Sequence, residues 1–388
     1  MNKRKGLTDK TPTLRDVPQV SLIIPTRNEA QTICECIQRA QQVFAEMDIA
    51  GEILVADSSS DETAAIAKSC GAKVIKPQKL GYGNAYLAGF EQAEGEYIVL
   101  MDGDLTYDPA AIRDMIEILQ SGNYDLVMGS RLKGEILPGA MPALHRYIGN
   151  PVLTWILNTL FSSNISDAHC GLRAIRKDAL KKLNHRSGGM EFASEMLIEA
   201  VCKDLRIAEV PITYSPRGGQ SKLHSITDGW RHVRFMMLYR PVPFLLVPGL
   251  LALVFGLALS SGVYLQGGSR MHSLILGGLL LIIGYQMLLA GLYFEAFGAS
   301  YGLSRPGRIK WMISYHSLEK ELFIGVILLA AGVLLGLKVM LSWGTSGFGA
   351  LDAASSAMMA MIFSILGIQT IFSGMFMSLL LLNSGQQE

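Results

Sequence analysis

Four long apolar stretches in the last 150 residues constrain the fold more than any other feature. A helix that crosses a bilayer needs about 20 apolar residues. Windows of this kind lie at about 244–265, 274–296, 322–343 and 357–382, and only Glu295 and Lys338 are charged within them. Buried helices of soluble proteins rarely run this long with so few charges. The sequence therefore predicts a helical membrane domain over residues 241–388.

The charged residues are distributed unevenly along the chain. Only 11 of the 67 charged side chains follow residue 240, so the first 240 residues have the charge density of a soluble domain. Lys and Arg near helix ends stay on the cytoplasmic side. Such residues precede the first window and lie between the second and third, whereas 344–356 has none. We therefore expect a multi-pass protein whose soluble domain and both termini are cytoplasmic.

Charge and cysteine usage exclude several classes. A net charge of +1 lacks the basic footprint of a nucleic-acid-binding protein. Residues 1–17 are polar without an apolar core, which indicates a flexible tail and no secretory signal. None of the five cysteines forms a CxxC pair, so we expect reduced thiols and no zinc site.

The soluble part alternates strands and helices. Apolar strand patterns at 20–24, 52–56, 73–75 and 97–101 are separated by polar turns and helical patterns. This order predicts an α/β domain with a mostly parallel sheet covered by helices on both faces.

Carboxylates follow two of these strands. Asp57 follows the second, and Asp102 and Asp104 follow the fourth, where ligands of such sheets bind. Two carboxylates spaced i, i+2 can face one divalent cation, and oxygen ligands suit Mg²⁺ or Mn²⁺ beside a diphosphate. An isolated Asp-x-Asp is also common in turns, so its sequence context decides the interpretation.

That context is a series of ordered motifs over about residues 18–240. They read VSLIIPTRNEA, ILVADSSSDET, KLGYGNAYLAGF, YIVLMDGDLTYDP, GSRLKG, DAHCGLRAIRK and GQSKLHSITDGWRH. This set resembles family 2 glycosyltransferases of the Rossmann-like GT-A fold, and most closely the dolichol-phosphate mannose and glucose synthase type. The resemblance implies a catalytic domain at 18–222 and a juxtamembrane amphipathic helix at 223–240. It also implies inverting transfer of a hexose from a UDP- or GDP-sugar to polyprenyl phosphate.

The resemblance assigns donor-side residues. Those matching the nucleotide pocket are Pro25, Arg27, Glu29, Asp57, Gly81, Gly83 and Asp102. The metal positions are Asp102, Asp104 and Thr106, with Asp104 the preferred direct ligand. Many members have a Gln at the position of Thr106 and a second Asp at that of Ala56, so the third ligand is open. Asp108 is an alternative ligand, or simply begins the helix at Pro109.

The acceptor side uses cations. The positions that match phosphate-binding residues are Arg131, Lys133, Arg146, Arg173 and Lys222. Asp167 matches a residue considered as a base in related enzymes, and orienting Arg173 or closing a loop is an equal alternative. With Asp102, Asp104 and Arg131 it completes the expected catalytic set. Two aromatic-rich helices, near 143–162 and 224–240, are expected at the membrane surface, with core packing as the alternative.

The sequence was also compared with two alternative functions. A processive polysaccharide or glycolipid synthase of the same fold would carry a QxxRW segment, which this chain lacks. A non-catalytic scaffold or flippase disagrees with the intact carboxylates and with spans that are almost free of charge. The residues do not choose between UDP-glucose and GDP-mannose, and they leave the oligomeric state, including a homo-oligomer, open.

Overall fold

The computed structural model describes residues 18–218, 225–265, 270–300, 317–349 and 353–382. The chain divides into two compact units, one up to Met236 and one from Met237 onward. The boundary falls within helix α8 (Ser225–Tyr239).

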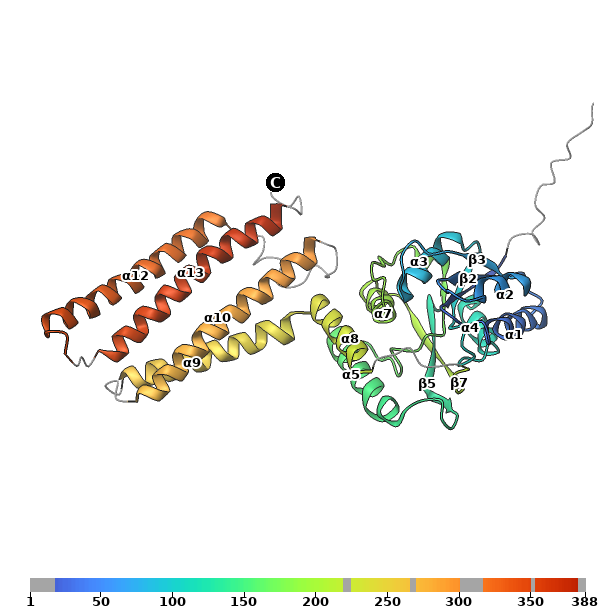
Figure 1. Cartoon of the computed structure of the whole chain (residues 1–388), viewed down its shortest axis with the longest axis horizontal. Coiled ribbons are helices and arrows are strands. Elements are labelled where there is room, and N and C mark those ends of the chain that lie inside the picture. The colour runs from blue at the N-terminus through green and yellow to red at the C-terminus, as the bar shows by residue number, and fades with distance from the viewer. Residues whose placement is uncertain (1–17, 219–224, 266–269, 301–316, 350–352, 383–388) are drawn as a thin grey trace, which may run out of the picture. The chain divides into compact units, whose positions relative to one another are not determined.

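A seven-stranded sheet organises the first unit (Figure 1). Its spatial order is β3-β2-β1-β4-β6-β5-β7, and only β6 runs antiparallel to its neighbours. The strand bounds are β1 Val20–Thr26, β2 Gly51–Asp57, β3 Lys73–Ile75, β4 Tyr97–Leu100, β5 Leu126–Ile136, β6 Arg173–Arg176 and β7 Ile207–Tyr214. The central strands are continuous apolar runs because helices bury both sheet faces. The predicted α/β architecture is confirmed.

Helices connect the strands. Those of the first unit are α1 Ile33–Glu46, α2 Thr63–Ser69, α3 Tyr82–Gln92, α4 Ala111–Gln120, α5 Asn150–Phe161, α6 Lys177–Leu180, α7 Phe192–Cys202 and α8, with a π-helical turn η1 at His145–Gly149. The buried residues Ile33, Ile37, Ala40 and Phe44 recur at helical spacing along α1 and join the core under the sheet.

The β5–β7 pairing is interrupted. The register shifts between Ser130 and Glu135, opposite Pro211 of β7. Proline has no N–H to donate, so a break in the ladder is expected there. The extra residues of β5 include Arg131 and Lys133, and the irregular backbone re-aims their side chains.

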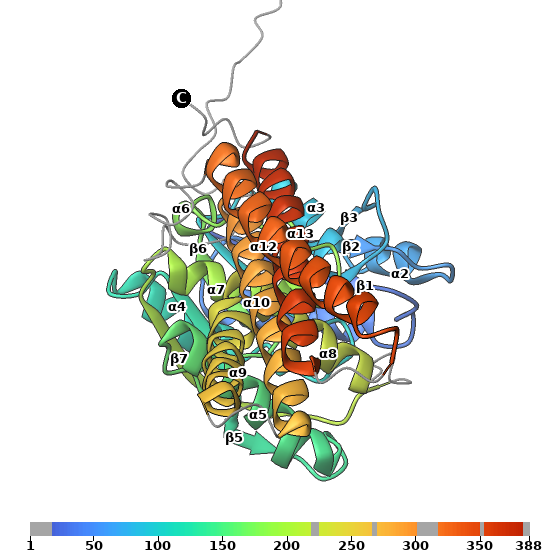
Figure 2. The same cartoon turned by 90° about the vertical axis from the view of Figure 1, so that its left-hand side faces the viewer.

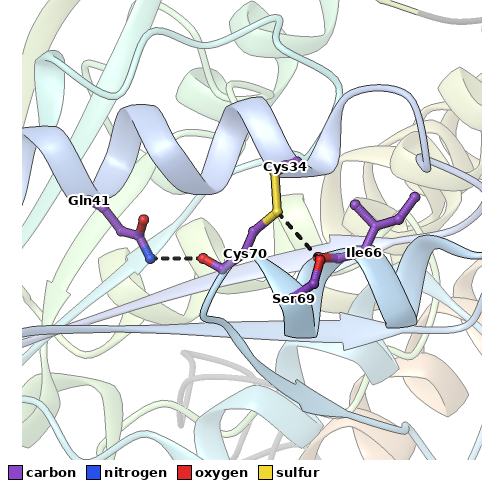
Figure 3. Close-up of a disulfide and its surroundings, with 5 residues drawn as sticks. All are labelled: Cys34, Gln41, Ile66, Ser69 and Cys70. Atoms are coloured by element: carbon purple, nitrogen blue, oxygen red, sulfur yellow. Dashed lines mark hydrogen bonds between the residues drawn. A yellow bond between two sulfur atoms is a disulfide. The ribbon is translucent and has the colours of Figure 1, made fainter.

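The cysteine expectation was partly wrong. Cys34 in the first turn of α1 and Cys70 at the end of α2 form a disulfide, with their Cα atoms 5.8 Å apart (Figure 3). The Gln41 side chain also donates to the Cys70 carbonyl across the same helix pair. The 36-residue separation conceals the pairing in the sequence. Cys36 and Cys170 are buried free thiols, as expected for reduced cysteines.

Among the described residues of the second unit, four helices are long and apolar enough to cross a membrane. Their bounds are α9 Val247–Leu265, preceded by a π-helical turn η2 at Val242–Leu246, then α10 Met271–Ser300, α12 Leu318–Thr345 and α13 Ala354–Leu382. Figure 2 shows them as long rods, and α12 packs closely on α13. A Cβ atom at Gly367 would lie 2.5 Å from the Leu329 backbone nitrogen, so glycine permits this approach.

Candidate active site

The carboxyl ends of three parallel strands meet at the candidate site. β1 pairs in parallel with both β2 and β4, so the residues that follow these strands lie at one edge of the sheet. This edge gathers Asp57, Asp102 and Asp104, as the strand-end rule predicts.

Asp104 is almost fully buried and held from two sides. Its Oδ1 accepts bonds from the Thr106 backbone N–H at 3.0 Å and from the Thr106 hydroxyl at 2.5 Å. Its Oδ2 pairs with Arg217 at 2.6 Å. The Thr106 hydroxyl thus supports Asp104 directly, and its role as a metal ligand stays a prediction.

Arg217 is a site residue that the motif analysis did not assign. The segment after β7 is bonded to the Asp102–Thr106 loop, because Ser215 N–H donates to the Thr106 carbonyl and Gly218 N–H to the Asp104 carbonyl. This pairing brings a guanidinium to Asp104 from 113 positions later in the chain. The sequence feature that could have identified Arg217 is its position five residues before Lys222 of the GQSK motif.

Asp102 is held by Tyr82 of α3. The Tyr82 hydroxyl donates to Asp102 Oδ1 at 3.1 Å, and a Cβ atom at Gly171 would lie 2.9 Å from the other carboxylate oxygen. Burial raises the pKa of Asp102 to about 7, and the neighbouring Asp104 carboxylate adds to the rise. Both effects disfavour the ionised form of Asp102, which a neighbouring cation would favour. Tyr82, too, was not singled out from the sequence.

Gly81 and Gly83 are required by protein packing. Gly81 has φ +141°, and a Cβ atom there would lie 2.1 Å from the Gly188 carbonyl oxygen. A Cβ atom at Gly83 would lie 2.0 Å from the Ser187 carbonyl oxygen. The backbone that approaches these glycines is the 187–188 segment, and contact with a nucleotide sugar stays a prediction.

The expected nucleoside side lies at the ends of β1 and β2. Asp57 accepts from the Thr26 hydroxyl at 2.7 Å and from the Ser59 hydroxyl and backbone N–H, which ties the two strand ends together. Pro25 is half-buried, Arg27 is exposed and Glu29 is half-buried on the adjoining turn. A cleft of about 490 Å³ opens beside this turn, lined by residues 28–32, Asp61 and Gly218. A second hollow, of about 520 Å³, lies between α4 and β7 and contains none of the predicted site residues.

Asp167 and Arg131 form a buried ion pair. Arg131 Nε donates to Asp167 Oδ2 at 2.7 Å and Nη2 donates to Oδ1 at 2.8 Å, while the Arg131 backbone N–H donates to Oδ2 at 3.1 Å. Both side chains are at least nine-tenths buried. Asp167 therefore orients Arg131, and not Arg173, which was one of the alternatives for Asp167. The two guanidinium nitrogens that bind Asp167 belong to a residue that was expected to contact the acceptor phosphate.

Glu209 of β7 supports the same loop. Its Oε1 accepts from the Ser166 N–H at 2.8 Å and hydroxyl at 2.7 Å, and from the Asp167 N–H at 3.3 Å. Its Oε2 pairs with Lys133 at 2.8 Å, although the Lys133 side chain stays half-exposed. Glu209 was not predicted, and it explains how the loop before β6 is fixed next to β5.

Two further expected cations have different environments. Arg173 is buried, and its guanidinium donates to the carbonyls of Cys170, Ala193 and Ala168 at 2.7–3.0 Å. These bonds hold α7 to the loop, so we assign Arg173 a structural role in place of the expected phosphate contact. Arg146 is exposed on η1, with its guanidinium 5.4 Å from the Tyr147 ring centroid. Lys222 lies outside the described residues.

The helix expected near 143–162 is formed by η1 and α5. Several large apolar side chains on it are exposed: Leu144, Tyr147, Ile148, Val152 and Trp155. Only Thr154, Leu157 and Phe161 of α5 are buried, so one face packs and the other does not. Asp108, the alternative metal ligand, is exposed and accepts from the Ala110 N–H at 3.0 Å in the turn that precedes α4.

The donor set is compatible with a Mg²⁺ or Mn²⁺ ion shared with a ligand. Within the described ranges, no group of three or more His, Cys, Asp or Glu side chains is placed to hold a metal ion. Mg²⁺ usually takes only one or two carboxylates and completes its shell with phosphate and water. Asp102 and Asp104 supply that number of carboxylates, and Arg217 is the positive charge that pairs with Asp104 in this structure.

Comparisons with known proteins agree with this fold. Residues 21–184 match glycosyl transferase family 2, and residues 292–381 match the family 2 C-terminal transmembrane region. The low-salt glycan biosynthesis hexosyltransferase Agl6 of Haloferax volcanii is 42% identical over 360 residues, which cover 92% of this chain and 87% of that protein. A dolichyl-phosphate hexose transferase of the same organism is 30% identical over 212 residues, covering 54% of this chain and 89% of that one.

Among solved structures, glucosyl-3-phosphoglycerate synthase from Mycobacterium tuberculosis, with Mn²⁺, uridine diphosphate and glucosyl-3-phosphoglycerate, superposes with a TM-score of 0.46. It is 21% identical and the match covers 57% of this chain and 79% of that one, a likeness that concerns the fold alone. The relationship to Agl6 extends over nearly the whole of both chains. The protein is therefore a membrane-bound member of glycosyltransferase family 2, with a GT-A catalytic domain followed by a region in which the described residues form four long apolar helices.

Proposed function

We propose that this glycosyltransferase moves a hexose from a UDP- or GDP-sugar to a polyprenyl phosphate at the cytoplasmic membrane surface. The observation that carries the proposal is the pair of Asp102 and Asp104, held by Tyr82 and Arg217 at the strand ends of a chain that also has four apolar helices. The names of relatives, a hexosyltransferase and a dolichyl-phosphate hexose transferase, support the same class of reaction.

On the donor side, the cleft beside the β1–α1 turn is the candidate nucleoside pocket. The turn carries Arg27 and Glu29, of which Glu29 lines the cleft, and Asp57 is bonded to Thr26 at the neighbouring strand end. Asp102 and Asp104 are the residues that would hold Mg²⁺ or Mn²⁺. Such an ion, when bound, supplies positive charge that stabilises a leaving nucleoside diphosphate.

On the acceptor side, the exposed apolar side chains of η1 and α5 are suited to a lipid surface. Arg146 stands among them and is exposed, so it is our preferred contact for the lipid phosphate. Lys133 is the second choice, because Glu209 already neutralises part of its charge. Burying an apolar helix face in the headgroup region would bring a polyprenyl phosphate to the edge of the catalytic domain.

The proposed step forms one bond and breaks one. A phosphate oxygen of the lipid attacks the anomeric carbon, the bond from that carbon to the diphosphate oxygen breaks, and the configuration inverts. The second pKa of a phosphate monoester is about 6, so the nucleophile is largely anionic at neutral pH and requires no base. The engagement of Asp167 by Arg131 is consistent with such a mechanism.

The test is a lipid-extraction assay on the purified full chain in detergent. It uses undecaprenyl phosphate, Mg²⁺ or Mn²⁺, and labelled UDP-glucose, GDP-mannose, UDP-galactose or UDP-N-acetylglucosamine in parallel. We expect label from one donor to enter the organic phase and chelator to abolish it. Asp104→Ala should lower transfer by more than a hundredfold, whereas Asp114→Asn, an exposed carboxylate on α4, should leave it unchanged.

Two results would contradict the proposal. Nucleoside diphosphate release without labelled lipid would mean that the acceptor is a saccharide or another lipid, as in a processive synthase. Near-normal transfer by Asp104→Ala would remove the metal assignment. A further variant, Arg146→Gln, should raise the KM for lipid and leave the KM for donor unchanged.

A further inference from the structure

Helix α8 buries a histidine against the catalytic domain. His232 and Met236, one turn apart, are 7% and 0% exposed, whereas Trp230 is 58% exposed. The helix therefore has a packed face and an exposed face, and its packed face includes an imidazole. Burying such a polar ring is unfavourable unless its nitrogens find partners.

A serine lies between His232 and a second histidine. Ser194 Oγ, fully buried on α7, lies 2.8 Å from His232 Nδ1 and 3.3 Å from His169 Nε2. The two imidazole rings contact edge to face with their centroids 4.6 Å apart. Three segments are thus joined through one hydroxyl: α8, α7 and the loop before β6.

The number of protons on the hydroxyl and the two imidazoles determines which groups donate in these hydrogen bonds. A hydroxyl has one proton, so Ser194 can donate to only one of the two imidazoles and must accept from the other. His169 Nδ1 is buried and has no hydrogen-bond partner among the described residues. A bare nitrogen lone pair costs less there than an unpaired N–H, which favours a proton on His169 Nε2. His169 then donates to Ser194, and Ser194 donates to His232 Nδ1.

A further proton on His232 Nδ1 is incompatible with these two hydrogen bonds of Ser194. A proton on His232 Nδ1 would remove the acceptor of the Ser194 hydroxyl and turn two N–H groups toward one oxygen. The charged groups that act on His169 are Arg131 of β5 and Arg173 of β6, both cationic, so they oppose protonation as well. Burial, His232 and these two guanidinium groups hold the pKa of His169 well below its usual range.

We propose that the His169–Ser194–His232 chain is a latch that holds α8 on the catalytic domain, and that it closes only while both imidazoles are neutral. In this latch, Ser194 and His232 are positioning residues for α8. They connect a helix that exposes Trp230 with the loop that carries Asp167, two residues before His169. This inference goes beyond the proposed reaction and does not depend on it.

The stability of α8 docking depends on pH because the docked and released states bind different numbers of protons. The docked state favours neutral imidazoles, so its stability is fully present above about pH 6.5, the ordinary histidine pKa, and falls as the pH drops below that value. For one imidazole that titrates normally when α8 is released, docking weakens about tenfold between pH 7.5 and 5.5.

The test is hydrogen–deuterium exchange of α8 peptides within residues 225–236, on the full chain in detergent without donor or acceptor. After correction for intrinsic exchange rates, protection of wild-type α8 should fall about tenfold from pH 7.5 to 5.5. Ser194→Ala should lose that protection already at pH 7.5. His232→Asn keeps an acceptor at the Nδ1 position and cannot be protonated, so its protection should fall less between the two pH values than that of the wild type, with His169 as the remaining titratable imidazole.

The matched control is Thr227→Ser on the exposed face of α8, which should behave as wild type. Unchanged protection of α8 in Ser194→Ala would overturn the latch. An equal pH response in wild type and His232→Asn would overturn the requirement for neutral imidazoles. Because neither sugar nor lipid is present, these outcomes are independent of whether the proposed transfer reaction is correct.

Discussion

Removing Asp167 tests whether the Arg131–Asp167 pair is chiefly a buried structural element. Asp167→Ala removes three acceptor contacts, two from the Arg131 side chain and one from its backbone, and leaves a guanidinium that is only 8% exposed. Breaking a buried ion pair from one side costs about 3–5 kcal/mol, because the remaining charge is desolvated without compensation.

The chain contains a matched control for this perturbation. Arg206 donates to Asp125 with the same three groups, Nε, Nη2 and the backbone N–H, at 2.9–3.0 Å. That pair is more accessible, with the Arg206 side chain 54% exposed. Asp125→Ala should therefore cost only about 1 kcal/mol. The difference between the two variants isolates the effect of burial.

The assay is thermal unfolding of the full chain in detergent. For a unit of this size about 1 kcal/mol corresponds to roughly 2–4 °C, so Asp167→Ala should lower Tm by about 6–20 °C and Asp125→Ala by about 2–4 °C. The double variant Arg131→Met/Asp167→Leu should recover most of the loss, since it leaves no unpaired buried charge. Equal decreases for Asp167→Ala and Asp125→Ala would refute the reasoning.

Two other perturbations have defined outcomes. His185 packs on Phe90 and Phe192, and both of its ring nitrogens are buried without hydrogen-bond partners in the described structure; burial and Arg173 lower its pKa to about 4. Because the pKa of His185 is depressed in the folded state, the free energy of unfolding should be constant above about pH 6.5 and about 2 kcal/mol lower at pH 5. His185→Phe should remove that decrease, which a comparison of Tm at pH 7.5 and pH 5 measures. Cys34→Ser/Cys70→Ser opens a 36-residue loop and should cost about 3–4 kcal/mol in thermal unfolding. Reductant should destabilise the wild type to the same extent and leave the double variant unaffected; a wild-type Tm that does not respond to reductant would contradict the bond's contribution.

Much of the fold was predictable because it depends on local patterns. Strand residues such as Leu22–Ile24 form continuous apolar runs, and the spanning helices are defined by length and absence of charge, so both are visible within windows of 5–25 residues. The position of Asp57, Asp102 and Asp104 at one edge followed from strand polarity alone.

Side-chain partnerships were decided by the tertiary structure. Arg173, expected at a phosphate, is bonded to three backbone carbonyls, and Asp167 orients Arg131 instead. The contacts of Arg217 with Asp104, Tyr82 with Asp102 and Cys34 with Cys70 join residues 20–113 positions apart. A charged side chain reads the same in the sequence whether it faces water or a buried partner. Only the packed fold sets its desolvation and its nearest counter-charge, and these determine which cations remain available to a ligand.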